Sequence, residues 1–207
     1  MKIYDISRTL SPTTAVWPGD QKFEHHWTMQ IPQGASVNVG AITLSVHIGS
    51  HADAPFHFDD SGADISQLSL EKFIGPVTVI ELKDSDKIQI EHVRRLDFSR
   101  VQRILFKTPG SFLEDSRWTA DFVYLATETA EFLGKNNVQL VGLDTPSVDP
   151  MTSKTLSAHK MLARYGIVNL ENLNLSHVPP GEYQLIALPL KLSGLDASPV
   201  RAVLIET

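Results

Sequence analysis

The chain has 207 residues, of which 18 are Lys or Arg and 24 are Asp or Glu, so its formal charge is 18 − 24, or −6. It has no cysteine, which excludes disulfides, thiolate zinc fingers, iron–sulfur clusters and a cysteine nucleophile. The acidic balance argues against nucleic acid or an anionic membrane as the main partner, because both are bound by clustered Lys and Arg.

The length and the spread of Gly and Pro predict one domain over residues 1–207. A chain of this size, 42% hydrophobic, can bury a sizeable core without disulfides. Gly and Pro occur singly rather than gathered in a linker. The start of the chain, residues 1–5, lacks the apolar run of a signal peptide, and no run of 18 apolar residues predicts a membrane span. We therefore expect a cytoplasmic protein.

Short β-type runs dominate the chain. Residues 37–47 alternate with a period of two, and β-branched or aliphatic runs follow at 77–82, 101–107, 138–143, 167–170, 183–190 and 200–205. The runs around Ile104 and Leu140 are apolar on both faces, as in central strands. Two helices are expected, over 127–133 with a stop at residues 134–135 (Gly-Lys) and over 155–165 with a stop at Gly166. Strands outnumber helices, so the predicted class is α/β or α+β, β-rich, with a mixed sheet or barrel and few helices.

The most informative segment is residues 47–58 (HIGSHADAPFHF), which spaces His47, His51, Asp53 and His57 as H-x3-H-x-D-x3-H. Imidazole and carboxylate are ligands for zinc, manganese and iron. Eight histidines in 207 residues correspond to about 0.4 per eleven residues, so three with an interleaved Asp indicate a metal site. Four histidines outside this segment are interpreted as ordinary surface or core residues: His25, His26, His92 and His177.

Ligands of one metal must converge, and this constrains the local chain. In an extended strand His51 would lie about 13 Å beyond His47. Gly49 and Pro55 discourage a helix. We therefore predict a strand that ends at His47, a turn at residues 49–50, and an irregular loop that folds the downstream ligands back over the strand end.

These groups alone would leave coordination positions open, as in a catalytic rather than a structural site. Asp53 has two oxygens and could bridge a second metal about 3.5–4 Å away. Candidate ligands for that second ion are His159, on the apolar face of its helix, and Glu171, after the strand over 167–170. A histidine such as His159 is more often a buried hydrogen-bonded residue, so the pattern alone leaves both interpretations open.

The segment from His47 to Phe58 resembles the His-x-Gly-Thr-His-x-Asp-x-Pro-x-His-Phe motif of the metal-dependent cyclase-like hydrolases, with Ser50 in place of Thr. The resemblance covers essentially the whole chain, and it implies a β-rich α/β domain of the swivelling β/β/α type that forms a homodimer. The stretches that agree with the kynurenine formamidase (arylformamidase) subfamily are residues 16–20 (VWPGD), 36–40 (SVNVG), 141–149 (VGLDTPSVD), 185–190 (LIALPL) and 198–203 (SPVRAV).

The resemblance implies that His47, His51 and Asp53 hold a first zinc. It implies that Asp53 bridges to a second zinc, which His159 and Glu171 also hold. Residue chemistry alone does not distinguish zinc from manganese at such a site.

The reaction that the resemblance implies is hydrolysis of N-formyl-kynurenine to kynurenine and formate, in tryptophan breakdown. His57 would transfer protons, and an imidazole with an unperturbed pKa near 6.5 can both accept and donate one at neutral pH. Trp17 would contact the substrate, although its turn-rich segment alone favours a core tryptophan under a loop. Asp144 ends a predicted central strand or caps a turn with Pro146, and is left outside the site.

Two other functions share the same residues. A cyclic amide or imide hydrolase of the isatin-hydrolase type would keep the His/Asp core, although the stretches around Trp17 and Asp144 favour the formamidase. A metal-dependent binding protein would hold metal and ligand without turnover. The presence of His57 as a fourth group beside three ligands favours catalysis.

Overall fold

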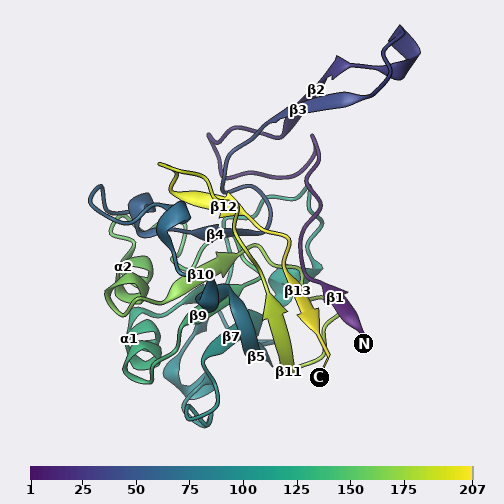
Figure 1. The fold of residues 1–207 in the computed structure, drawn as a ribbon. Helices are drawn as coiled ribbons and strands as arrows, with labels where there is room; N and C mark the ends of the chain where they lie inside the picture. The colour runs from purple at the N-terminus through teal and green to yellow at the C-terminus, as the bar shows by residue number, and fades with distance from the viewer. Residues whose placement is uncertain (207) are drawn as a thin grey trace.

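The structure is a computed structural model that describes residues 1–206. These residues form a nine-stranded mixed sheet that curls into a half-barrel, with two α-helices stacked along one side (Figure 1). The predicted class, β-rich with a mixed sheet and few helices, is confirmed. In spatial order the strands are β1 (Ile3–Asp5), β13 (Val203–Ile205), β11 (Gly181–Ile186), β5 (Ile74–Glu81), β7 (Arg103–Lys107), β9 (Leu140–Leu143), β10 (Val168–Glu171), β4 (His51–Asp53) and β12 (Ala197–Pro199).

Smaller elements occupy the connections. Two further strand pairs are β2 (Glu24–Met29) with β3 (Val39–Thr43) and β6 (Lys87–Ile88) with β8 (Tyr124–Leu125). Short 3₁₀ helices are η1 (Ile31–Gln33), η2 (Pro55–His57), η3 (Ile65–Gln67), η4 (Leu70–Phe73), η5 (Ile90–His92) and η6 (Pro109–Phe112).

Four adjacent strands in the middle of the sheet, β5, β7, β9 and β10, run parallel. Every residue of β7, β9 and β10 is buried, as expected for parallel strands covered on both faces. Along β7, Ile104 and Phe106 enter one apolar core and Leu105 enters the other, because successive side chains alternate across the sheet. The prediction of central strands around Ile104 and Leu140 is therefore confirmed.

The predicted strands are present with shifted ends. β7, β9 and β13 start two or three residues later than expected, β5 starts three residues earlier, and β11 starts earlier and ends at Ile186. Backbone pairing across the sheet decides these ends, and the local apolar pattern does not encode it.

The two helices lie side by side, as α1 (Thr127–Lys135) and α2 (Ser157–Arg164). α1 runs two residues beyond the predicted end at residue 133 and ends at Lys135, within the predicted stop at residues 134–135. A Cβ atom at Gly134 would lie 2.2 Å from the Tyr165 ring, so this glycine lets α2 approach α1 rather than ending the helix. α2 starts two residues later than predicted because Leu156 has a left-handed backbone conformation (φ 49°). Neither helix in the described chain has the length and apolarity needed to cross a membrane.

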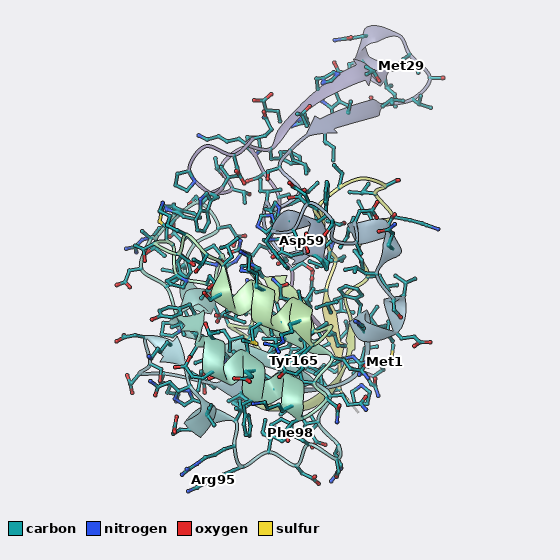
Figure 2. The ribbon with its side chains drawn as sticks, turned by 90° about the vertical axis from the view of Figure 1, so that its left-hand side faces the viewer. Met1, Met29, Asp59, Arg95, Phe98 and Tyr165 are labelled. Carbon is teal, nitrogen blue, oxygen red and sulfur yellow. The ribbon has the colours of Figure 1, made fainter. Side chains whose placement is uncertain are left out.

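A hairpin of β2 and β3 projects away from the half-barrel (Figures 1 and 2). Only the middle of the predicted strand over residues 37–47 is present, as β3. β2 has no counterpart among the predicted elements, because all its residues are exposed and it has no buried face for alternation to reveal. Exposed apolar side chains on or beside this hairpin are Trp27, Met29, Ile31, Val37, Val39 and Ile42.

The predicted strand ending at His47 is wrong, because β3 ends at Thr43. Residues 46–50 form turns and bends, which include the predicted turn at residues 49–50. The predicted irregular loop after that turn is also wrong, because the next strand, β4, holds the downstream part of the histidine motif. Gly49 shapes this connection with a φ of 60°, and a Cβ atom there would lie 2.5 Å from the Leu10 side chain. β4 is extended because its backbone pairs with β10 on one side and β12 on the other, which are remote in sequence.

Candidate metal centre

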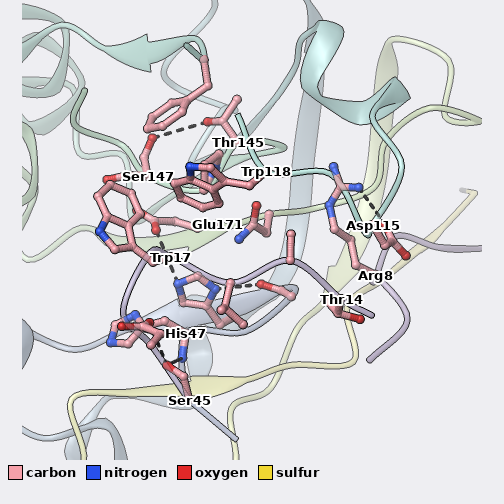
Figure 3. A pocket seen from close by; sticks show the side chains of 18 of the residues that line it. Arg8, Thr14, Trp17, Ser45, His47, Asp115, Trp118, Thr145, Ser147 and Glu171 are labelled. Carbon is pink, nitrogen blue, oxygen red and sulfur yellow. Dashed lines mark hydrogen bonds and ion pairs between the residues drawn. The ribbon is translucent and has the colours of Figure 1, made fainter. Parts of the chain in front are cut away.

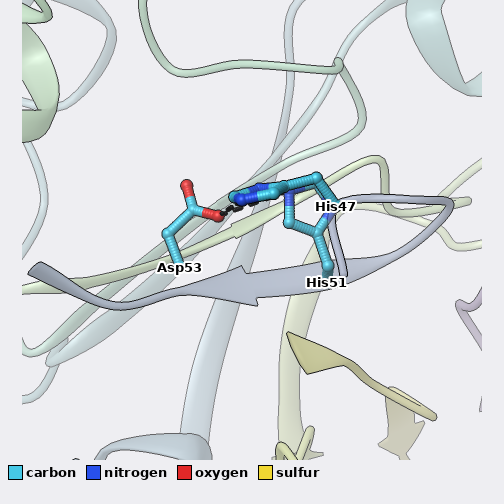
Figure 4. Close-up of side chains that lie close together, drawn as sticks. All are labelled: His47, His51 and Asp53. Atoms are coloured by element: carbon cyan, nitrogen blue, oxygen red, sulfur yellow. Dashed lines mark ion pairs between the residues drawn. The ribbon is translucent and has the colours of Figure 1, made fainter. Parts of the chain in front are cut away.

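β4 presents His51 and Asp53 on one face of the sheet, because side chains two residues apart in a strand point the same way. Both side chains are buried. The preceding turns bring His47 back toward the strand, so that its Nδ1 lies 3.1 Å from Asp53 Oδ1 (Figure 4). His51 Nε2 lies 3.4 Å from the same oxygen. These three side chains therefore meet around one carboxylate oxygen.

β10 and α2 supply the second half of the cluster. Glu171 is the register partner of His51 between β10 and β4, and its Oε2 lies 3.4 Å from His51 Nε2. Glu171 was expected to follow the strand, but it is the last residue of β10. His159, on α2, places Nε2 3.3 Å from Asp53 Oδ2 and 3.2 Å from Glu171 Oε1. Asp53 thus turns one oxygen toward each half of the cluster.

Each of the three clustered histidines has an acceptor at its outer ring nitrogen. These bonds run from His51 Nδ1 to the Gly49 carbonyl (2.9 Å), from His159 Nδ1 to Asp149 Oδ2 (2.7 Å) and from His47 Nε2 to Asp196 Oδ2 (2.8 Å). With the proton on the outer nitrogen, the inner nitrogen turns a lone pair toward the carboxylates of Asp53 and Glu171. Metal-ligating histidines have this arrangement, with the second nitrogen donating to a carboxylate or a carbonyl.

The spacing of the cluster fits a tetrahedral divalent cation. Two ligands with zinc bonds of about 2.0–2.1 Å are about 3.3 Å apart at a tetrahedral angle, and the nitrogen–oxygen separations around Asp53 are 3.1–3.4 Å. In the part of the chain that the structure describes, His51 Nε2 and Asp53 Oδ1 are buried without a hydrogen-bond partner. A buried lone pair facing a carboxylate is unfavourable unless a proton or a metal lies between them.

Two groups of potential ligands share Asp53. One contains His47 and His51, and the other contains His159 and Glu171. A carboxylate with its two oxygens directed at different groups is suited to bridge two ions. The arrangement is therefore compatible with a two-metal site.

Charge inside the cluster shifts the titration of its members. Burial alone would lower the pKa of His47, but the Asp196 and Asp53 carboxylates raise it to about 9. Burial would also lower the pKa of His51, which Asp53 and Glu171 raise to about 10. Conversely, burial would raise the pKa of Asp53, but the histidines facing it hold that pKa well below its usual range. Positive charge next to the carboxylates of Asp53 and Glu171, carried by protons on the histidines or by a metal ion, therefore stabilises the cluster.

His57 lies at the edge of the cluster, at the end of η2. Its ring centroid is 4.3 Å from that of His47 and 5.9 Å from that of His159. Its Nδ1 donates to Asp196 Oδ2 over 3.1 Å. The side chain is 31% exposed, whereas those of His51 and His159 are 1% and 2% exposed. The third histidine of the motif thus stands next to the buried group and is open to solvent.

Three polar residues that the sequence analysis did not assign hold the cluster in place. Asn169 donates through Nδ2 to Asp53 Oδ2 (2.7 Å) and Glu171 Oε1 (3.1 Å). Asn169 could have been identified from the sequence, because it is a polar residue inside an otherwise apolar predicted strand, two positions before Glu171. Asp149 orients His159, and it ends the stretch over 141–149 that carried part of the resemblance. Asp196 had no local signal, because its partners lie 139 and 149 residues away in sequence.

The remaining predicted positions lie apart from the cluster. Asp144 is buried and accepts hydrogen bonds from the backbone N–H and the hydroxyl of both Thr108 and Ser111. Burial raises the pKa of this carboxyl. Asp144 thus holds the segment after β7, and leaving it outside the candidate ligands agrees with its contacts. His25 and His26 lie on the exposed hairpin. His92, in η5, is hydrogen-bonded to Gln89 and Ser85, which precede that helix. His177 lies against Tyr4.

A cavity of about 700 Å³ opens beside the cluster (Figure 3). Its lining includes the clustered histidines and Glu171, together with the aromatic rings of Trp17, Trp118 and Phe122. Trp17 is half-buried and packs edge-on against Trp118, with ring centroids 5.1 Å apart. Trp17 therefore forms part of a cavity wall next to the polar cluster, and does not occupy the core position that its turn-rich segment alone favours.

Comparison with known proteins agrees with this geometry. A family model described as "Putative cyclase" matches residues 4–150. The chain is 46% identical to a kynurenine formamidase of Salinibacter ruber over 99% of this chain and 97% of that protein. Among solved structures, a predicted metal-dependent hydrolase from Bacillus stearothermophilus is 30% identical with a TM-score of 0.82, covering 98% of this chain and 97% of that one.

A more distant structure shares the fold alone. Isatin hydrolase A from Labrenzia aggregata superposes with a TM-score of 0.85 over 100% of this chain and 94% of that one, at 24% identity. The match over residues 4–150 and the near-complete coverage of the relatives leave one assignment: the chain belongs to the cyclase family.

Proposed function

We propose that this protein hydrolyses N-formyl-kynurenine to kynurenine and formate, as a metal-dependent kynurenine formamidase. The observation that carries the proposal is the buried cluster around Asp53, where three imidazole nitrogens face carboxylate oxygens at the spacing of metal ligands. This cluster borders a cavity whose wall includes aromatic side chains. The Salinibacter ruber relative, 46% identical over nearly its whole length, supports the choice of reaction.

We propose that the cluster holds two zinc ions, with manganese as the alternative metal. His47, His51 and Asp53 would hold the first ion, and Asp53, His159 and Glu171 the second. When bound, such ions lower the pKa of water toward about 7 and polarise a carbonyl oxygen. The nitrogen and oxygen donors suit zinc and manganese, and the two oxygens of Asp53 support the bridge.

His57 is proposed to move the proton. In the reaction an oxygen of water bonds to the formyl carbon, the bond from that carbon to the aniline nitrogen breaks, and a proton passes from the water to the nitrogen. His57 lines the cavity, lies beside His47 and is partly exposed, so its ring can reach both the water and the leaving nitrogen. Its Nδ1 donates to Asp196, which leaves Nε2 to exchange the proton.

Trp17 is proposed to hold the aryl ring of the substrate. It lines the cavity with Trp118 and Phe122, and offset or edge-to-face contact with an aromatic ligand is favourable. The volume of about 700 Å³ lies within the range of small-molecule sites. This wall would orient the ring so that the formamide group faces the metal cluster.

The alternative is a cyclic amide hydrolase of the isatin-hydrolase type. At 24% identity the isatin hydrolase supports the fold and not the substrate, whereas the formamidase relative is closer. Purified protein with its metal content measured should be assayed on N-formyl-kynurenine and isatin side by side. We expect turnover of the formamide. Turnover of isatin alone would reject the proposal, and metal retention with no turnover of either would indicate a binding protein.

We also propose that the protein is a homodimer. The β2–β3 hairpin exposes apolar side chains, among them Trp27 at 50% and Ile42 at 63% exposure. An isolated two-stranded hairpin is at best marginally stable in water, so packing of this one against a second copy would stabilise it. Light scattering on the purified protein measures the mass directly. The cytoplasmic location expected from the sequence stays a prediction.

A further inference from the structure

We propose that Asp196 is a positioning residue that sets the orientation and tautomer of two imidazoles at once, His47 and His57. The inference rests on the proposed function, because the roles of the two histidines come from it. It adds a residue outside the proposed ligand set and outside the proton-transfer step itself.

A single oxygen of Asp196 makes both contacts. Oδ2 lies 2.8 Å from His47 Nε2 and 3.1 Å from His57 Nδ1. The two rings are 4.3 Å apart between centroids and inclined by 44°. The carboxylate therefore bridges two rings that come from different segments of the motif, a turn and a 3₁₀ helix.

The sheet holds Asp196 in this place. The next residue, Ala197, starts β12 and is the register partner of Asp53 in β4. The Asp196 carbonyl accepts a hydrogen bond from the Ala54 N–H (2.8 Å), and the carbonyl of Leu195 accepts one from the Ile65 N–H (2.9 Å). The backbone on which the carboxylate stands is thus tied to the strand that carries the central ligands. A change in the carboxylate can alter the rings without removing these backbone bonds.

The contacts decide which nitrogen of each ring carries a proton. An acceptor at His47 Nε2 places the proton there, so Nδ1 turns its lone pair toward Asp53 and the proposed metal. An acceptor at His57 Nδ1 places the proton there, so Nε2 is the nitrogen that exchanges a proton in the cavity. Without the carboxylate both rings could rotate or change tautomer.

The same three side chains also satisfy the spacing of a metal site, since their ligand atoms lie within 4.8 Å of one another. Two observations favour hydrogen bonding over coordination. His47 has a second nitrogen, Nδ1, facing Asp53. That nitrogen would hold the proposed first metal, while Nε2 would donate to Asp196 as an outer carboxylate. The His57 and Asp196 side chains are also about one-third exposed, unlike the buried cluster.

Kinetics of two substitutions test the role. We expect Asp196→Ala to lower kcat on N-formyl-kynurenine about 10–100-fold, with KM changed less than about threefold. Asp196→Asn keeps an oxygen that can accept from both rings, so it should recover most of that loss. Asp97→Ala is the matched control, because Asp97 is an exposed aspartate away from the cavity lining and should leave kcat unchanged. An unchanged kcat in Asp196→Ala would overturn the proposal.

Two readouts are independent of turnover. In the zinc-loaded protein with ¹⁵N-labelled histidine, long-range ¹H–¹⁵N spectra should show His57 protonated at Nδ1, and Asp196→Ala should shift it toward the Nε2–H tautomer. Zinc content at saturation should equal that of the wild type. Loss of one ion would make Asp196 a ligand and overturn the positioning role, as would a wild-type His57 protonated at Nε2. If the wild-type protein does not hydrolyse the formamide, the proposed function fails, whereas the spectra and zinc content still decide the role of Asp196.

Discussion

Asp149 Oδ2 accepts a hydrogen bond from His159 Nδ1 over 2.7 Å, and this bond directs the other nitrogen of His159 at Asp53. The same carboxylate accepts the backbone N–H groups of Ala158 and His159 in the first turn of α2. One buried side chain therefore both stabilises the start of a helix and aims the histidine that the helix carries.

Asp149→Ala should weaken binding of the second ion and destabilise the protein together. We expect about a 10–100-fold loss of affinity for that ion, and a loss of roughly 1–3 kcal/mol of unfolding free energy from the unpaired N–H groups. Competition with a chromophoric chelator measures the affinity, and denaturant unfolding measures the stability. Asp149→Asn keeps an acceptor and should show smaller losses. Equal zinc affinity in the wild type and the alanine variant would contradict the orienting role of Asp149.

His57→Ala separates proton transfer from metal binding. We expect the variant to keep its zinc and to lose about 10²–10⁴-fold in kcat, the range that general acid–base catalysis contributes. Metal analysis and steady-state kinetics on the same sample measure both quantities. A variant that loses zinc would show that His57 is a ligand.

Asp53→Ala should remove both ions, because its two oxygens face the two halves of the cluster. The truncation also leaves the buried histidines without their shared carboxylate, so thermal unfolding should be recorded alongside the metal content. Asp97→Ala, at an exposed position away from the cavity, should keep the full metal content. Full metal content in folded Asp53→Ala would refute the bridge.

The metal-free protein should lose stability as pH rises above neutrality. The folded pKa values of His47 and His51 are raised to about 9 and 10, above an unfolded value of about 6.5. Their contribution to stability is therefore complete below about pH 6.5 and is lost as the pH rises through the folded values. Thermal unfolding of the chelator-treated protein between about pH 6 and 9 measures this trend, and a midpoint that rises over that interval would oppose it.

Zinc binding should show the opposite dependence on pH. The metal must displace protons from these imidazoles, so its affinity should increase as pH rises toward the raised pKa values. The gain in melting temperature on adding zinc should accordingly be larger at about pH 8 than at about pH 6. A gain that is independent of pH would mean that the metal displaces no protons from these histidines.

Trp17→Ala should raise KM for aryl formamides more than it lowers kcat. Loss of an aromatic contact is worth about 0.5–1.5 kcal/mol, or about 2–10-fold in binding. Trp17→Phe keeps a ring against Trp118 and should fall between the wild type and alanine. Steady-state kinetics on N-formyl-kynurenine measure the split. An unchanged KM in Trp17→Ala would exclude contact between this side chain and the substrate.

Much of the fold could be predicted from local patterns. Runs such as residues 101–107, apolar on both faces, can only be satisfied in a strand covered on both sides, and β7 has that place. The two helices are predictable in part from their C-terminal stop signals, and the second also from the apolar face that carries His159. The ends of the elements are less predictable. Gly134 shows this, because its role depends on the ring of Tyr165, the residue that follows α2.

The kind of chemistry at the site can be predicted from residue types alone. With no cysteine, and with three histidines and an aspartate between residues 47 and 57, metal ligands here must be nitrogen and oxygen atoms. The geometry of the site depends on contacts between segments that are remote in the chain. Antiparallel pairing of β4 with β10 sets Glu171 beside His51, and pairing with β12 brings Asp196 to His57. Backbone hydrogen bonds between segments that are remote in sequence determine which strands pair. The local spacing of side chains does not predict this pairing.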